Sequence, residues 1–486
     1  EHYAGDDEYA NEGAYFNLPQ SNEPRVDLAN DPVLAKLEPA EAARRLLSGV
    51  PVGGLHPSDV LHGLTPLLKD CCILQTEVSM RTARSLLERL TREKKNINAA
   101  LLRELKDRAA EQSGLCGASE VAPPLVLSSL PFHILMHGWA RMSGRGFHRD
   151  GPEKIAEIIE WMDREDQYDA QIRRDFDALV AADDDEDRRR RRNMPSCQPT
   201  TASYNTLLTA YTYASKHDRL AGKKAEQILR MMSRRNQESG WHCKPNTRSF
   251  GLAISVHAKS DRYKSAIFAQ YVLNDMKVMH EAERERYEAE VGAPYNAEDP
   301  GSNAWRIVTP DNIAYTTVMS AFASADAKGY AQKAEDVLFD MIDSSGKYGI
   351  RVDSPAFDAC IRGWSAAAKR MGNPKARFEA AERAEGMLKL MEEMAAEVES
   401  IGEDEDQDMD AMGDVEEPGD DRDKRVSNPL APTTRTYNAV LSAWARSDIK
   451  EAAPRAEALL YKMLATVIPP GAAADGDDVS VVPPHD

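Results

Sequence analysis

The chain has 486 residues, of which 42% are hydrophobic, so it is long enough for several domains or one long repeat array. This composition excludes a fully disordered chain, and an aromatic content of only 7% favours helices. The formal net charge is −19, from 61 Lys and Arg against 80 Asp and Glu, which taken alone argues against a nucleic-acid ligand.

The negative charge is concentrated in three segments. Residues 402–423, 1–30 and 467–486 carry net charges of −11, −6 and −4, which leaves the rest of the chain at +2. These segments have too few large apolar residues to form a core, so residues 1–30 and 466–486 are predicted to be disordered tails. The nearly neutral body has enough Lys and Arg for a basic face.

Several kinds of site are not indicated. The six cysteines include no Cys-x-x-Cys pair, so neither a zinc site nor a disulfide framework is predicted. No run of 18 apolar residues occurs, which excludes a transmembrane helix. Without a Walker A, Gly-x-Gly-x-x-Gly or Gly-x-Ser-x-Gly motif, we expect no enzyme activity, no cofactor and no small-molecule substrate.

The N-terminal third carries weak helical patterns. Residues 83–90 have an apolar stripe of helical period, residues 64–71 resemble a degenerate partner helix, and residues 96–111 are predicted to be helical. We interpret residues 31–120 as degenerate helical repeats that cap the rest of the chain. The chain starts with Glu1 rather than Met, which indicates either a processed form or a fragment. No basic, Ser-rich presequence is visible, so any transit peptide is expected to have been removed.

Six later segments share one template. Each has apolar residues at positions 0, +3 and +4 from a leading aromatic residue, five of the six have an aromatic residue at +7, where His257 is the exception, and five of the six have Gly or Ala at +6. A second template, Ala-x-x-Φ-Φ-x-x-Met with Φ apolar, follows each first one, with Ile155 in the place of Ala in the first repeat. The pairing predicts two helices joined by a short turn. The leading aromatic residues are Phe132, Tyr204, Phe250, Tyr315, Phe357 and Tyr437.

A helical hairpin with two apolar stripes buries both only by stacking against its neighbours. Residues 121–465 are therefore predicted to form an all-α fold, an α-solenoid of six stacked helical hairpins. Uneven spacing places inserts at 164–197, 278–307 and 394–430, each between a second helix and the next first helix. Trp364 and Trp444, at position +7, are predicted to lie in the core.

The phrases QPTTASYNTLLTAY (198–211), TPDNIAYTTVMSAF (309–322) and APTTRTYNAVLSAW (431–444) resemble the start of pentatricopeptide repeats. Members of that family bind single-stranded RNA in organelles, with one base per repeat. The resemblance implies a sequence-selective RNA-binding adaptor in organellar RNA processing, stability or translation, in a mitochondrion or chloroplast. The long inserts depart from the family pattern.

The resemblance also implies which residues read bases. The first reader of a repeat is the residue directly after its leading aromatic residue. The second reader stands four places before the leading aromatic residue of the following repeat. By the resemblance, Asn205 with Asn246 would favour a pyrimidine, C in particular, and Thr316 with Asp353 would favour G. Gly251 has no side chain to read with and Asp358 would repel phosphate, so we expect partial readout. The first readers are His133, Asn205, Gly251, Thr316, Asp358 and Asn438, and the second readers are Thr200, Asn246, Asp311, Asp353 and Thr433.

The residue chemistry at positions +1, +5 and +9 is consistent with this face, since these positions lie opposite the apolar stripe. Position +9 is basic in Arg141, Lys259 and Arg446, which suits phosphate contacts. The alternative is that these positions form the solvated side of each first helix. His133 and His137 have the i, i+4 spacing of two metal ligands, but no third ligand is placed and no metal site is predicted.

Two function classes remain open. The first is the RNA-binding adaptor, with other proteins as additional partners through the inserts and tails. The second is a protein-binding α-solenoid scaffold, such as a subunit of a large ribonucleoprotein assembly like an organellar ribosome. A continuous basic strip along the groove would favour RNA, and a neutral apolar groove would favour protein.

Overall fold

A computed structural model describes most of the repeat region. Parts of the predicted segments lie outside the described residues. They include the predicted tail at 1–30, residues 468–486 of the predicted tail at 466–486, residues 31–67 of the N-terminal segment, residues 181–195 of the insert at 164–197, and residues 411–427 of the insert at 394–430. The residues that the structure describes are 68–69, 71–112, 123–146, 149–180, 196–239, 241–260, 264–292, 294–296, 307–325, 327–410, 428–447 and 450–467.

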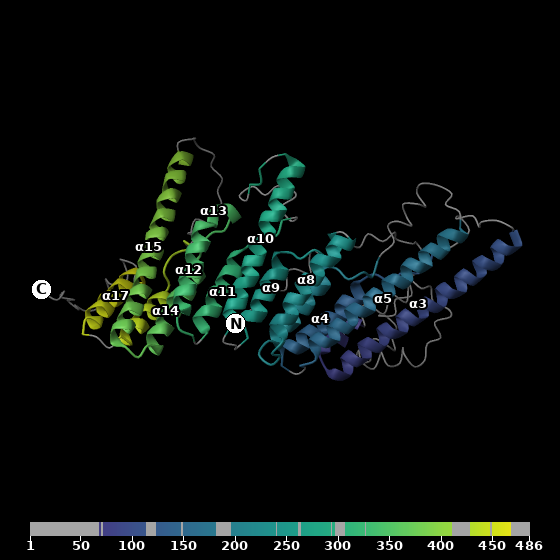
Figure 1. The fold of residues 1–486 in the computed structure, drawn as a ribbon, viewed down its shortest axis with the longest axis horizontal. Coiled ribbons are helices and arrows are strands. Elements are labelled where there is room, and N and C mark those ends of the chain that lie inside the picture. The colour runs from purple at the N-terminus through teal and green to yellow at the C-terminus, as the bar shows by residue number, and fades with distance from the viewer. Residues whose placement is uncertain are drawn as a thin grey trace. The chain divides into compact units, whose positions relative to one another are not determined.

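The described residues form helices and connecting turns with no β-strand, which confirms the predicted all-α class (Figure 1). In chain order they are α3 (Glu77–Gln112), α4 (Leu130–Gly144), α5 (Gly151–Leu179), α7 (Thr201–Ala214), α8 (Ala221–Ser239), the 3₁₀ turn η5 (Trp241–Cys243), α9 (Thr247–Ala258), α10 (Ser265–Val291), α11 (Asn312–Ser324), α12 (Tyr330–Asp343), α13 (Ser345–Tyr348), α14 (Ser354–Arg370), α15 (Pro374–Asp410), α16 (Thr434–Ala445) and α17 (Ala452–Val467).

The chain divides into two compact units. Unit 1 comprises residues 1–138 and 162–198, and unit 2 comprises 139–161 and 199–486. The boundaries fall within α4 and α5, so each of these helices contributes to both units. None of the described helices combines the length and apolar character that a membrane span requires.

Unit 1 is built on α3, a single helix of 36 residues that contains both of the segments predicted to be helical at 83–90 and 96–111. Leu102 and Leu105 of α3 pack against Ile172, Phe176 and Val180, at and just beyond the C-terminal end of α5. The hydrophobic pattern at 164–179, within the first predicted insert, therefore belongs to a helix with a buried face.

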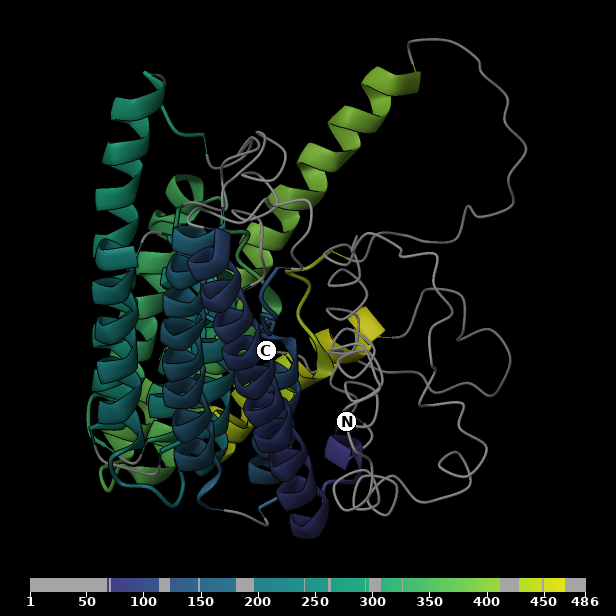
Figure 2. The same cartoon turned by 90° about the vertical axis from the view of Figure 1, so that its right-hand side faces the viewer.

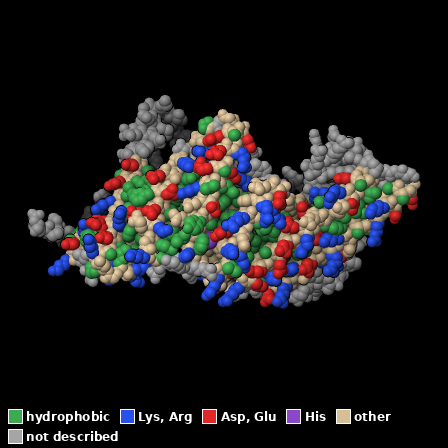
Figure 3. Space-filling model, in the orientation of Figure 1, with side chains coloured by type: hydrophobic (Ala, Val, Ile, Leu, Met, Phe, Trp, Pro, Cys, Tyr) green, Lys and Arg blue, Asp and Glu red, His purple; other side chains and the backbone are tan. Residues whose placement is uncertain are grey.

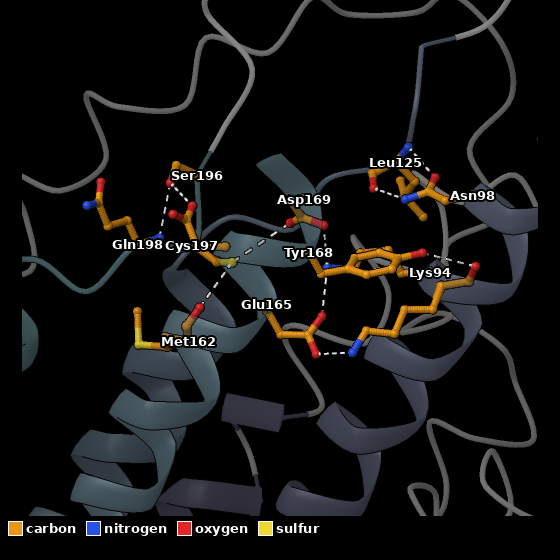
Figure 4. A network of polar contacts seen from close by, with 12 residues as sticks. Lys94, Asn98, Leu125, Met162, Glu165, Tyr168, Asp169, Ser196, Cys197 and Gln198 are labelled. Carbon is orange, nitrogen blue, oxygen red and sulfur yellow. Dashed lines mark hydrogen bonds and ion pairs between the residues drawn. The ribbon is translucent and has the colours of Figure 1, made fainter. Parts of the chain in front are cut away.

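A buried ionic network also joins α3 to α5 in unit 1 (Figure 4). The ammonium of Lys94 lies 2.7 Å from Asp169 Oδ1 and 2.9 Å from Glu165 Oε2, and all three side chains are almost inaccessible to solvent. Burial would lower the pKa of Lys94, but the attraction of Asp169 and Glu165 outweighs burial and raises this pKa. For Asp169, burial is the larger effect and raises the pKa.

Two connecting segments are tied to the same helices. Cys197 Sγ lies 3.8 Å from Asp169 Oδ2 and from the carbonyl oxygen of Met162 (Figure 4). Burial, with the nearby Asp169 carboxylate, raises the pKa of the Cys197 thiol to about 12, so the thiol is neutral. Asn98 of α3 donates to and accepts from the backbone of Leu125 at 2.9 Å, which holds the segment before α4.

Unit 2 contains successive helical hairpins that stack in chain order. The first helices α7, α9, α11, α14 and α16 contact one another in series, and each of α10, α12 and α15 also contacts the first helix of the following hairpin. Each hairpin thus buries its stripes against its neighbours, as the repeat pattern predicts. This confirms the α-solenoid class for the described hairpins.

The second helices α10 and α15 are much longer than their partners, with 27 and 37 residues against 12 and 17 for α9 and α14 (Figures 1 and 2). Residues 278–291 and 394–410, assigned from the sequence to inserts, continue these helices. On α10 the extension EAERERYEAEV consists mainly of strong helix formers, with Arg284 paired to Glu281 and Glu288.

The repeat stripe forms the core. All six leading aromatic residues are between 0% and 4% exposed. Trp364 and Trp444 are buried, which confirms their predicted place. The Trp444 ring meets Phe378 at a centroid distance of 5.3 Å, and the guanidinium of Arg455 lies 5.0 Å from the ring centroid.

A hydrogen bond that the hydrophobic pattern did not indicate recurs between the hairpins of unit 2. The first residue of each of α7, α9, α11 and α14 has a side-chain donor within hydrogen-bond distance of a backbone carbonyl two residues before the cap of the next first helix. This bond fixes the spacing between successive helix starts. The pairs are Thr201 with Lys244 at 2.7 Å, Thr247 with Thr309 at 3.0 Å, and Asn312 with Arg351. At Ser354 the equivalent carbonyl, of Ala431, lies at 3.2 Å, and the hydroxyl is closer to the carbonyl of Pro429, at 2.5 Å.

We predict that Trp444→Ala lowers the free energy of unfolding by about 3–5 kcal/mol, because the change leaves a cavity between packed helices. Urea unfolding monitored by circular dichroism measures it. Tyr461→Ala is the control, since Tyr461 is 48% exposed on α17, and its cost is expected to be about 0.5 kcal/mol or less. Equal losses for the two variants would contradict the core assignment.

Lys94→Met is expected to cost about 3–5 kcal/mol, because it leaves Glu165 and Asp169 buried without their cation. Lys106→Met removes the same charge from an exposed position of α3 and is expected to be nearly neutral. Thermal unfolding of the two variants provides the comparison. A Lys94→Met protein as stable as Lys106→Met would show that the network is not needed for stability.

Candidate nucleic-acid interface

The five predicted second readers all lie at N-caps, the residues directly before α7, α9, α11, α14 and α16. Four of them accept a hydrogen bond from the backbone N–H three residues on. The fifth, Thr200, donates its own backbone N–H to Ser203 Oγ at 3.1 Å. The four bonds are Ser249 N–H to Asn246 at 3.0 Å, Ala314 N–H to Asp311 at 2.8 Å, Ala356 N–H to Asp353 at 3.2 Å and Thr436 N–H to Thr433 at 3.3 Å.

Capping accounts for the residue types at these positions. The first N–H groups of a helix have no partner within the helix, and Asn, Asp and Thr supply the acceptor that they need. Burial raises the pKa of Asp311, although the N–H of Ala314 favours its charged form. The polar identities that resemble base readers therefore have a structural cause of their own, whether or not RNA is bound.

The structure brings one predicted reader pair together. Asn205 Nδ2 lies 3.4 Å from Asn246 Oδ1, across the junction between α7 and α9. Asn205 Oδ1 also accepts a hydrogen bond of 2.6 Å from the hydroxyl of Ser249. Asn205 is 8% exposed, whereas Asn246 is exposed at the surface, so the pair extends from the core to solvent.

Thr316 and Asp353 do not form a comparable pair in the described structure. Asp353 lies 3.4 Å from Asn312 Nδ2 instead, and the buried hydroxyl of Thr316 has no hydrogen-bond partner. Gly251 faces open space, with no atom within 4 Å of the point where a Cβ would lie. The Asp358 carboxylate accepts a bond of 2.7 Å from Thr436 Oγ1.

The remaining predicted residues differ in accessibility. Arg141, Lys259 and Asn438 are exposed. Arg446 is exposed too, and its guanidinium donates to the carbonyl and hydroxyl oxygens of Ser365 at 3.1 and 3.0 Å. His133 is half-buried on α4.

Burial, together with the neighbouring His137, lowers the pKa of His133 to about 4, so the imidazole is neutral near pH 7. No group of three metal-ligating side chains gathers among the residues that the structure describes.

A cavity of about 660 Å³ in unit 2 adds residues that sequence reasoning missed. Lys259 lines it together with Arg149, Lys216 and the ring of Tyr213, which is 45% exposed. The ammonium of Lys259 lies 5.8 Å from the centroid of the Tyr213 ring. A cation beside an exposed aromatic face suits a phosphate with an adjoining base.

Acidic residues balance part of this charge. Lys224, also in the cavity wall, pairs with Glu153 at 3.0 Å and Asp218 at 2.9 Å. Burial would lower the pKa of Lys224, but the bonds from Asp218 and Glu153 raise it. On the face shown in Figure 3, Lys and Arg side chains are likewise intermingled with Asp and Glu rather than gathered into one continuous strip.

The stacked hairpins define an α-helical repeat protein. No protein-family model and no curated protein matches the chain. Among solved structures, the chain is similar to crystal structures of the pentatricopeptide repeat protein PPR10, and of a triple Cys-to-Ser variant of it, each in complex with an 18-nt psaJ RNA element.

In both matches the identity is 15%, the alignment covers 90% of this chain and 60% of the other, and the TM-score is 0.20. The chain thus spans less than two thirds of those proteins. A similarity this weak does not establish a shared function, so the repeat assignment rests on the hairpins themselves.

Thr433→Ala is predicted to lower the free energy of unfolding by about 1 kcal/mol, through loss of the cap on α16. Thr433→Ser keeps an acceptor oxygen and is expected to retain most of the stability. Chemical denaturation of both variants distinguishes the two results. An alanine variant as stable as the serine variant would show that the cap does not account for this residue type.

Proposed function

We propose that this protein binds single-stranded RNA along the junctions between its hairpins and acts as an adaptor in organellar RNA processing, stability or translation. The observation that carries the proposal is the Asn205–Asn246 pair, in which two amides from successive repeats meet and one of them, Asn246, is exposed to solvent. Amides are suited to the donor and acceptor atoms of a base edge. The organellar location rests on the family resemblance alone.

The cavity beside α7 and α9 supports the same proposal. Lys259 directly follows α9, nine positions after Phe250, and it lines the cavity together with Arg149, Lys216 and the exposed ring of Tyr213. These cations would hold the phosphates, and the ring would stack on a base without selecting its identity. Selectivity would then come from the amide pair and affinity from the cavity.

A second candidate function is that of a protein-binding scaffold, which exposed apolar side chains on α10 favour. Phe268, Tyr271 and Val278 are 42%, 56% and 69% exposed. An apolar surface of this kind is suited to a protein partner rather than to a polyanion. Binding to a random pool of single-stranded RNA separates the two candidates. If the wild-type protein retains no RNA at low salt, the adaptor proposal is wrong.

We expect Lys259→Gln to weaken binding of all retained RNA sequences alike and to reduce the slope of log affinity against log salt concentration by about 1. Lys106→Gln in unit 1 makes the same change in net charge and is expected to leave the slope unaltered. Fluorescence anisotropy over a salt series measures both. Identical slopes for the two variants would exclude a phosphate contact by Lys259.

A further inference from the structure

The outer face of α10 carries an apolar row, formed by Phe268, Tyr271 and Val278. These side chains are 42%, 56% and 69% exposed. Their spacing of three and seven residues places them along one side of the helix, away from the fully buried Ala269 and Met276. Apolar side chains that gather on one solvated face are typical of a surface that contacts another protein.

Two other second helices flank the apolar row, α8 on one side and α12 on the other, and the three follow one another in Figure 1. Between α8 and α10 lies a groove of about 420 Å³, to which α8 contributes Arg230 and Arg234 and α10 contributes Asp275. On its other side α10 pairs with α12 through Lys277 and Asp340. The three helices therefore form one surface with α10 in the middle.

The exposed charges on the two flanking helices have opposite signs. A basic row, Arg230 and Arg234, lies on α8, and an acidic row, Asp336 and Asp343, lies on α12. Arg230 has Glu226 at 3.6 Å, but its side chain is 78% exposed. Such an exposed ion pair is weak, so the guanidinium remains available to a second carboxylate. The apolar row thus lies between a basic row and an acidic row.

A surface with this order of charges is complementary to a copy of itself. Two copies can meet face to face around a twofold axis that lies in the plane of contact. If this axis runs along α10, each basic row faces the acidic row of the other copy. If the axis runs across α10, like charges face each other. We propose that this protein forms a homodimer in which the two α10 helices pack in parallel at the twofold axis, with each basic row against the partner's acidic row.

The second-helix template gives the heights at which the side chains meet. Arg234 on α8, Val278 on α10 and Asp343 on α12 each stand nine residues after the Ala that begins the template. Equal template positions lie at equal heights when the hairpins stack as equivalent units. In the parallel arrangement Arg234 of one protomer therefore faces Asp343 of the other, and the two copies of Val278 meet between them at the axis.

RNA is less suited to this surface, because its phosphates would meet Asp275 and the acidic row as well as the two arginines. The inference goes beyond the proposed RNA binding and does not depend on it, since the Asn205–Asn246 pair lies at the junction of α7 and α9. It specifies the second candidate function, because the protein partner of α10 is then another copy of this chain.

Sedimentation equilibrium of the full chain over a series of concentrations tests the apolar row. We expect a monomer–dimer equilibrium for the wild type. Val278→Asp should weaken the dimer by about tenfold or more, because it places two carboxylates against each other at the axis. Ile313→Asp is the matched control, since Ile313 is 70% exposed on α11, and it should dimerise like the wild type. A Val278→Asp protein that dimerises as well as the wild type would overturn the inference.

Charge reversal tests the pairing of the two flanking rows. A protein with Arg230→Glu and Arg234→Glu has acidic rows on both sides, and one with Asp336→Lys and Asp343→Lys has basic rows on both sides. Each should be monomeric alone, because like charges then meet at both contacts. An equimolar mixture should form a heterodimer, because acidic rows of the first protein then meet basic rows of the second.

The outcomes of the charge reversal separate this dimer from other arrangements. Two variants that each dimerise like the wild type would show that a different surface is used, and a mixture that stays monomeric would contradict the row-to-row pairing. A wild-type chain that remains monomeric at every concentration would overturn the dimer and leave the RNA proposal unaffected. Failure of the chain to retain any RNA would overturn that proposal and leave the dimer unaffected.

Discussion

The start of each first helix is the constraint on which the repeat architecture of unit 2 depends. Backbone N–H groups in the first turn have no helical partner, and the buried junctions admit little water to satisfy them. Residues 246, 311, 353 and 433 supply acceptors. In α7, α9, α11 and α14, the first residue of the helix bonds through its side chain to the backbone segment that leads into the following hairpin. Polar side chains thus set the register, and apolar stripes supply the packing.

The sequence predicted the core well because its signal is periodic. Leading aromatic residues, the Met of most second helices and both Trp364 and Trp444 recur at helical spacing, and the structure buries them. The lengths of α10 and α15 were less predictable, since strongly charged helices resemble solvated linkers in composition. The Lys94 network was missed because its partners stand about 70 residues apart, and isolated charges carry no periodic signal.

The candidate site was predicted in part. Family resemblance placed Asn205 beside Asn246, and the two amides are in contact. It paired Thr316 with Asp353 in the same way, but the orientation of those side chains depends on a neighbour that the repeat template leaves unspecified. Ser249 donates its hydroxyl hydrogen to Asn205, whereas the hydroxyl of Thr316 has no hydrogen-bond partner. The +9 cations were predicted, whereas Tyr213 and Lys216 became relevant only through the shape of the cavity.

The hydrogen bonds from the first residues of α7, α9, α11 and α14, which link successive hairpins, also bear on how unit 2 responds to tension. Each link consists of a few hydrogen bonds at most, from one short residue to the segment that leads into the next hairpin, and the packed stripes likewise join nearest neighbours. A force that pulls the two ends of unit 2 apart would therefore act in turn on every junction between successive hairpins. The extension would be divided among many weak contacts. A small increase in spacing at each junction would therefore add up to a large increase in the length of unit 2.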